Sequence, residues 1–148
     1  MIEAITQIIA GFVGSIGFGI LFNVHGRKLL MASFGGFASW SLFLGLSAFI
    51  KNEPLNYFIV ALIISVYAEI MARKLKSPTT CFITISLIPL IPGGSLYYTM
   101  AYAFQSDIEN FTSKGIYTLS LAAALALGII VATTFTRIIN IKRGVSKC

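Results

Sequence analysis

Two prolines and two glycines stand in the middle of an uncharged apolar run that covers residues 81–104. Pro89 and Pro92 each lack a backbone N–H, and each proline ring clashes with the preceding turn of a helix. The glycines that follow, Gly93 and Gly94, allow positive φ angles. Together these residues predict a helix that breaks near the middle of a bilayer.

The new helix N-terminus expected at residues 94–96 would expose free N–H groups and the positive end of a helix dipole inside the membrane. Such an end suits a carboxylate, and many secondary transporters hold anionic substrate groups on broken helices. Ser95 adds a hydroxyl donor beside these amides. Tyr97, Tyr98 and Tyr102 are expected to line or close the path. The alternative is a plain proline kink, with the tyrosines in an interfacial aromatic belt.

Glu69 is the only acidic residue that lies deep enough in one of the predicted spans to matter for transport, although it is near one end of that span. Intramembrane carboxylates often bind protons or substrate amines, so Glu69 is a candidate for coupling transport to a proton gradient. Arg73 lies four residues later on the same helix face, in the order that favours an ion pair. The alternative interpretation is therefore a structural pair of Glu69 with Arg73 near one end of the helix.

From the remaining reactive side chains we expect no metal site, no bound cofactor and no enzymatic activity. His25 has no second histidine or cysteine near it and is interpreted as an interfacial loop residue. Cys81 and Cys148 lack the spacing of metal ligands, so we expect neither a metal nor a disulfide. The chain contains no HExxH, GxSxG or phosphate-loop motif. Asn110 and Thr112 fit a glycosylation sequon, a triplet that is common by chance.

The composition requires lipid as a major solvent for the chain. Charged residues make up only 11% of it and hydrophobic residues 57%, whereas soluble domains carry about 25% charged residues. Five apolar runs each approach the roughly 20 residues that cross a hydrocarbon core as a helix. We therefore predict one all-α, polytopic membrane domain over residues 1–148. Its spans are expected near residues 2–22, 29–50, 55–72, 81–104 and 115–136.

The basic residues flank the apolar runs, so the net charge of +6 indicates membrane topology rather than nucleic-acid binding. If all five runs span, nine Lys and Arg residues fall on one side and two on the other. The positive-inside rule then predicts the N-terminus outside and the C-terminus in the cytoplasm. The nine are Arg27, Lys28, Arg73, Lys74, Lys76, Arg137, Lys142, Arg143 and Lys147, and the two are Lys51 and Lys114.

Small residues recur at four-residue spacing along three of the runs. Such stripes let two helix backbones approach closely, which predicts helix–helix seams. Part of this surface is also available to a partner chain or to an oligomer. The stripes are Gly11, Ser15 and Gly19, then Ala32 and Gly36, then Ser120, Ala124, Gly128, Ala132 and Thr136.

Several motifs resemble the threonine/serine exporter family, and the resemblance covers nearly the whole chain. The most specific is the proline–glycine run Ile88-Pro89-Leu90-Ile91-Pro92-Gly93. The match is to the smaller, C-terminal half of that family, which occurs as a separate small-subunit protein. The other matching motifs are Glu69-x-x-x-Arg73, Lys76-Ser77-Pro78, Tyr97 and the early run from Gly17 to Val24.

The resemblance implies a multi-pass secondary exporter of a small amino or carboxylic acid in a bacterial inner membrane. Threonine and serine are the named substrates, and related two-component members are associated with dicarboxylates such as succinate. A larger transmembrane subunit would supply the other half. By this resemblance, Pro89, Pro92 and Gly93 would shape the pathway, and Glu69 and Arg73 would be polar residues beside it. The alternative is a non-transporting membrane scaffold that stabilises a partner.

Overall fold

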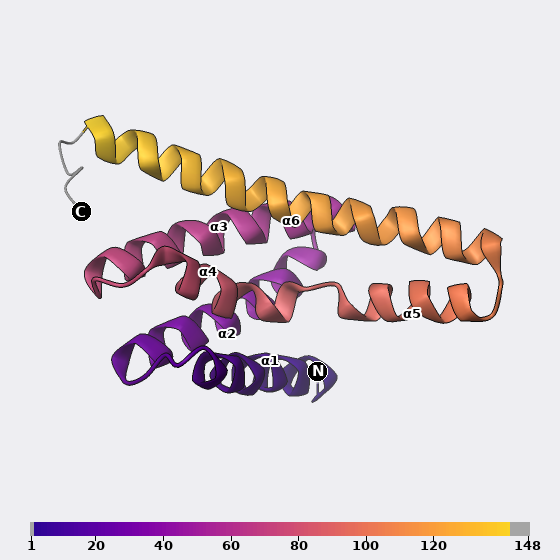
Figure 1. The fold of residues 1–148 in the computed structure, drawn as a ribbon, viewed down its shortest axis with the longest axis horizontal. Helices are drawn as coiled ribbons and strands as arrows, with labels where there is room; N and C mark the ends of the chain where they lie inside the picture. The colour runs from indigo at the N-terminus through magenta and orange to yellow at the C-terminus, as the bar shows by residue number, and fades with distance from the viewer. Residues whose placement is uncertain (1, 143–148) are drawn as a thin grey trace.

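The computed structural model describes residues 2–142, and these residues form helices without any strand (Figure 1). The result confirms the predicted all-α fold. In chain order the helices are α1 (Ile2–Leu21), α2 (Arg27–Ser47), α3 (Glu53–Lys74), α4 (Thr79–Leu87), the 3-10 helix η1 (Ile88–Leu90), α5 (Gly93–Phe104) and α6 (Ile108–Lys142).

The described helices supply up to five candidate membrane spans. Four of them, α1, α2, α3 and α6, are each long and apolar enough to cross a membrane. The segment made of α4 and η1, taken together with α5, is also long and apolar enough to cross once, with a bend of 62° between the two parts. Large apolar side chains face outward, as in Ile9 at 56% and Phe135 at 63% exposed, which is typical of helices in lipid. The predicted polytopic bundle with a broken fourth helix is therefore confirmed.

The last helix is longer than the apolar pattern predicts. α6 has 35 residues, which corresponds to about 52 Å, against a hydrocarbon core of about 30 Å. It begins at Ile108 rather than near residue 115, so most of the polar stretch before the apolar run is helical. The carboxylate of Asp107 accepts a hydrogen bond from the Asn110 N–H at 3.2 Å. This N-terminal cap explains why the helix starts early.

The helices form a bundle from which one hairpin extends. α2 contacts α1, α3 and α4, and α6 runs first beside α5 and then along α3 (Figure 1). In Figure 1, α5 and the first half of α6 extend beyond the right-hand ends of α1, α2 and α3 as an antiparallel pair. The broken helix therefore leaves the bundle after η1 and continues along α6.

Small residues form seams between the helices, as the stripes predict. A Cβ added to Gly128 of α6 would lie 2.7 Å from the carbonyl oxygen of Phe58 and 2.8 Å from the Cβ of Ala61, both in α3. A Cβ on Gly36 of α2 would collide with the side chain of Ser15 in α1. The missing side chains therefore let these backbones approach one another closely.

Buried hydroxyl groups lie between α2, α3 and α4. The Ser86 hydroxyl of α4 donates to the carbonyl oxygen of Ala32 in α2 at 3.1 Å, which ties the short helix to the bundle. Ser33 of α2 and Ser65 of α3 are fully buried, and neither hydroxyl has a hydrogen-bond partner within the described part of the chain. A buried hydroxyl without a partner lowers stability, so these two serines are a cost of this packing.

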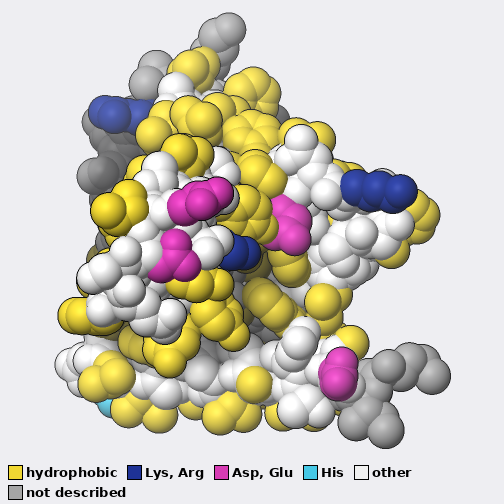
Figure 2. All heavy atoms as spheres, turned by 90° about the vertical axis from the view of Figure 1, so that its right-hand side faces the viewer, with side chains coloured by type: hydrophobic (Ala, Val, Ile, Leu, Met, Phe, Trp, Pro, Cys, Tyr) yellow, Lys and Arg dark blue, Asp and Glu magenta, His cyan; other side chains and the backbone are white. Residues whose placement is uncertain are grey.

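Charged residues separate to the two ends of the bundle. The basic end holds the α1–α2 and α3–α4 connections, and the acidic end holds the start of α1 and the α2–α3 and α5–α6 connections (Figure 1). Figure 2 faces the acidic end and shows several Asp and Glu side chains, with a few Lys or Arg side chains, among apolar ones. The segregation agrees with the predicted alternation of loops, while the direction of insertion stays a prediction. Arg27, Lys28, Arg73, Lys74 and Lys76 lie at the basic end, where Glu69 is the acidic residue. Glu3, Glu53, Asp107 and Glu109 lie at the acidic end, together with Lys51 and Lys114.

Candidate functional site

The predicted break occurs between α4 and α5. α4 ends at Leu87, and a single 3-10 turn, η1, carries Pro89. Ile91 is then extended, with φ −61° and ψ 124°, and Pro92 precedes the first residue of α5. Because neither proline can donate a backbone hydrogen bond, the helical ladder cannot continue through this segment. The chain therefore turns by 62° here.

The break leaves two backbone N–H groups without partners. The Gly93 N–H donates to the carbonyl oxygen of Ile91 at 2.7 Å, and the Leu96 N–H closes the first turn of α5 at 3.0 Å. No side chain caps this helix end. Among the described residues, no acceptor is recorded for the N–H groups of Gly94 and Ser95. These are two of the free amides that the sequence predicts.

Neither a positive φ angle nor close packing within this chain requires glycine at the two positions of the break. The only described glycine with a positive φ is Gly26, so Gly93 and Gly94 do not use their conformational freedom. A Cβ on either of them would meet no atom within 4 Å. Both residues are exposed. What the missing side chains do provide is open access to the backbone amides of this turn.

The predicted pathway residues of α5 lie on its open surface. Tyr97 is 69% and Tyr98 57% exposed, and their rings meet edge to face at 5.6 Å. The carbonyl oxygen of Ser95 accepts a hydrogen bond from the Thr99 hydroxyl at 2.8 Å. Thr99 also lies 3.2 Å from the Thr118 hydroxyl of α6, a polar tie between the two helices. The tyrosines therefore do not enclose a path within this chain, and their role stays a prediction.

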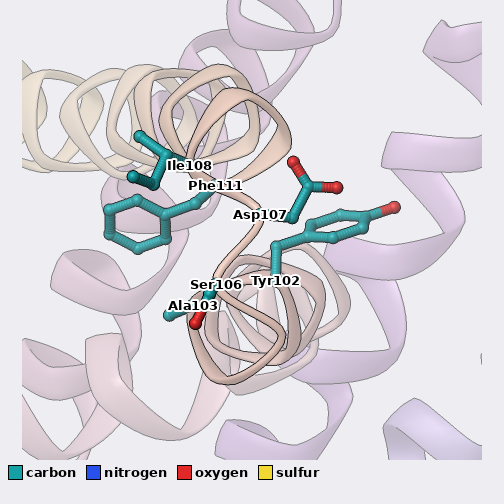
Figure 3. A pocket seen from close by; sticks show the side chains of 6 residues that line it. All are labelled: Tyr102, Ala103, Ser106, Asp107, Ile108 and Phe111. Atoms are coloured by element: carbon teal, nitrogen blue, oxygen red, sulfur yellow. The ribbon is translucent and has the colours of Figure 1, made fainter.

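A small pocket of about 160 Å³ lies at the connection between α5 and α6. Figure 3 shows Tyr102 and Asp107 on one side of this turn and Ile108 and Phe111 on the other. The Asp107 carboxylate is occupied as a helix cap, because the Asn110 side-chain amide donates to it at 2.7 Å. Hydrogen bonds from the side chain and backbone of Asn110 lower the pKa of Asp107. The carboxylate at this pocket is thus already engaged at the start of α6.

Glu69 and Arg73 form an ion pair within α3. The Arg73 guanidinium nitrogen lies 2.6 Å from the Glu69 carboxylate, and the Glu69 side chain is only 12% exposed. This geometry confirms the predicted pairing along one helix face. The ion pair lies near the basic end of α3. The break is in a different part of the molecule, where the chain enters α5 and continues beside the first half of α6. A coupling role for Glu69 stays a prediction.

A second pocket was not predicted from the sequence. It measures about 390 Å³ and lies at the basic end, between the α1–α2 and α3–α4 connections. The two connections are some fifty residues apart in the chain, so no local motif signals the pocket. Each contains a residue with positive φ, Asn23 at 58° and Lys76 at 48°, which turns the chain sharply. The polar lining consists of Asn23, His25, Lys28, Ser77 and Cys81.

The described residues hold no group of three or more His, Cys, Asp or Glu side chains that could bind a metal ion. Cys81 is a free thiol, and Cys148 lies outside the residues that the structure describes.

Discontinuous helices near the bilayer midplane are common in membrane transporters. A family model described as "Threonine/Serine exporter, ThrE" matches residues 7–135, and the chain belongs to this family. Its members are membrane transporters rather than enzymes. No curated protein and no solved structure matches the chain.

Proposed function

We propose that this chain is the small subunit of a bacterial inner-membrane secondary exporter for small amino acids or carboxylates, such as threonine, serine or succinate. The observation that carries the proposal is the break before α5. There the N–H groups of Gly94 and Ser95 have no acceptor among the described residues, and Gly94 borders open space. Amides at a helix N-terminus bind a carboxylate favourably, because they donate hydrogen bonds at the positive end of the dipole.

The depth of the break supports a transport role. A Cβ on Gly11, halfway along α1, would lie 3.4 Å from the Cβ of Pro89. We infer that α1 crosses the bilayer, so that η1 lies near the midplane and α5 leads toward one surface. Irregular backbone at that depth requires protein or a water-filled cavity beside it. The open side of the break is therefore where we place the substrate path.

A larger transmembrane subunit would complete this path. α5 packs along α6, while Gly93, Gly94 and the neighbouring tyrosines remain exposed. One chain with an open break cannot enclose a polar substrate in lipid. We infer that the larger subunit covers this side, and that Tyr97 and Tyr98 line the path against it.

The charge distribution supports one direction of insertion. The basic end would face the cytoplasm by the positive-inside rule, with the N-terminus outside. Substrate would then move from the basic end, along α4, to the break and out along α5. Glu69, near the basic end, would be the proton-coupling carboxylate, with Arg73 holding its charge between cycles.

The proposal is tested by efflux from cells that are loaded with threonine, serine or succinate and express both subunits. Gly93→Leu places a large side chain over the open amides and should abolish efflux without harming the fold, because no atom of this chain is near its Cβ. Gly45→Leu is the matched control, since Gly45 in α2 is also exposed with open space around it. Its efflux should match that of the unaltered protein.

A scaffold role predicts a different outcome. The double variant Pro92→Ala, Gly93→Leu should abolish efflux while the two subunits still co-purify. Normal efflux from that variant would favour a scaffold that only stabilises its partner. Glu69→Gln separately addresses coupling: we expect it to remove the dependence of efflux on the proton gradient. Coupling that survives this change would leave Glu69 as a structural partner of Arg73.

A further inference from the structure

The pocket at the basic end is built from two connections that turn sharply toward each other. The α1–α2 connection contributes Asn23 and His25, and the first turn of α2 contributes Lys28. The α3–α4 connection contributes Ser77, followed by Cys81 in the first turn of α4. Its volume of about 390 Å³ lies within the range of about 300–1,000 Å³ found for small-molecule sites. The pocket is therefore large enough for a metabolite, and it opens at the end where we expect the cytoplasm.

The charge of the pocket favours an anion. Lys28 supplies a positive charge, and none of the residues that line the pocket carries a carboxylate. α2 and α4 both begin at this pocket, and neither has a side-chain cap or an acidic residue in its first turn. Their N-terminal dipoles thus add to the charge of Lys28. Glu69, the acidic residue on this half of α3, is already paired with Arg73.

The pocket continues along α4 as a groove that contains hydroxyl groups. A second hollow of about 180 Å³ shares Phe22 and Cys81 with it and adds Thr80 and Thr84. Thr80 and Thr84 are four residues apart and so lie on one face of α4. The next turns of the chain lead to η1 and the break. The hydroxyl groups of Thr80 and Thr84 thus lie beside the pocket on the first turns of α4, between the basic end and the break.

We propose that this pocket is the cytoplasmic loading site, which binds the carboxylate of a small amino acid or dicarboxylate through Lys28 before it moves to the break. The inference rests on the proposed export function and deepens it. Ser77 and the threonines of α4 would hold the remaining polar groups of the substrate. An anionic lipid phosphate has similar chemistry, so the experiment must separate the two ligands.

Cys81 provides a reporter inside the pocket. In a Cys148→Ser background it is the only thiol of this chain, because the sequence contains two cysteines. Inside-out membrane vesicles with both subunits would be treated with a charged maleimide, and labelling of this chain followed on a gel. Succinate or L-threonine should slow the labelling in a saturable way, by about tenfold at ten times its Kd, since occupancy follows mass action. Labelling that neither compound slows would overturn the proposal.

Variants of Lys28 separate binding from general charge effects. Lys28→Gln should remove the protection of Cys81, while Lys28→Arg should retain much of it. Lys74→Gln is the matched control, because Lys74 is an exposed cation at the same end that does not line the pocket. Protection that is lost equally in the Lys74 variant would count against a site at Lys28. Protection that survives in Lys28→Gln would do the same.

Two further comparisons distinguish the possible failures. The first comparison uses the purified protein in phosphatidylcholine vesicles, with or without phosphatidylglycerol. If phosphatidylglycerol protects Cys81 and succinate and threonine do not, the pocket is a lipid site and the proposal is overturned. Gly93→Leu should abolish efflux but leave protection intact, which separates loading from transport. Normal efflux without protection would refute the loading site alone. Protection without efflux of any loaded compound would refute the export function and leave a carboxylate site.

Discussion

The seam between α3 and α6 should be sensitive to a single methyl group. In Gly128→Ala the new Cβ would start 2.7 Å from the Phe58 oxygen, 2.8 Å from the Ala61 Cβ and 3.1 Å from the Leu62 nitrogen. Ordinary contacts between carbon atoms are about 3.5–4.0 Å, so α6 must retreat by close to 1 Å. A gap of about 0.5–1 Å forfeits a quarter to a half of each contact energy along the seam.

The expected loss of stability in Gly128→Ala is best measured against the same substitution at a glycine that has free space around it. Gly14→Ala in α1 makes the same chemical change, yet its Cβ would meet no atom within 4 Å. Both changes gain about 1 kcal/mol of helix propensity, so this gain cancels in the difference between the two variants. Overpacking costs about 1–3 kcal/mol. We expect the upper half of that range at Gly128, because two of the three close atoms are backbone atoms that no side-chain rotation can move.

The assay is reversible unfolding in mixed micelles, followed by the fluorescence of the single tryptophan, Trp40. Trp40 belongs to α2 and stacks on Phe43 at 5.3 Å, so neither substitution alters the reporter itself. The free energy of unfolding of Gly128→Ala should fall below that of Gly14→Ala by the overpacking energy. Equal stabilities would refute the close α3–α6 seam.

Further predictions concern buried hydroxyls and a helix cap. Ser65→Ala should raise the free energy of unfolding by about 1 kcal/mol because its hydroxyl is buried without a partner, whereas Ser86→Ala should lower it by a similar amount. The same unfolding assay checks both variants. If the two substitutions changed the free energy of unfolding by the same amount and in the same direction, the hydrogen bond from Ser86 to Ala32 would be contradicted. The pKa of Asp107 is lowered in the fold, so its cap is complete above the ordinary Asp range and is lost as pH falls through the lowered value. The hydrogen-exchange protection factor of the Asn110 amide should drop over that acidic range, and should already be low in Asp107→Ala.

Local chemistry explains what the sequence predicted correctly. The break follows from Pro89 and Pro92, since a residue without an N–H interrupts a helix whatever surrounds it. The Glu69–Arg73 pair follows from a spacing of four residues on one helix. The early start of α6 was missed because charged and polar residues lowered its apolar signal, although Asp107 caps the helix there.

The sequence alone determined the helical membrane fold, the separation of charge between loops and the position of the break, because each depends on composition or on neighbours within a few residues. The tertiary structure decided that Gly128 meets α3, that α5 leaves the bundle along α6 and that two connections close a pocket around Lys28. It also decided that Gly93 and Gly94 border open space. These features depend on which helix faces meet, and the packing energy that selects those faces joins residues distant in the chain.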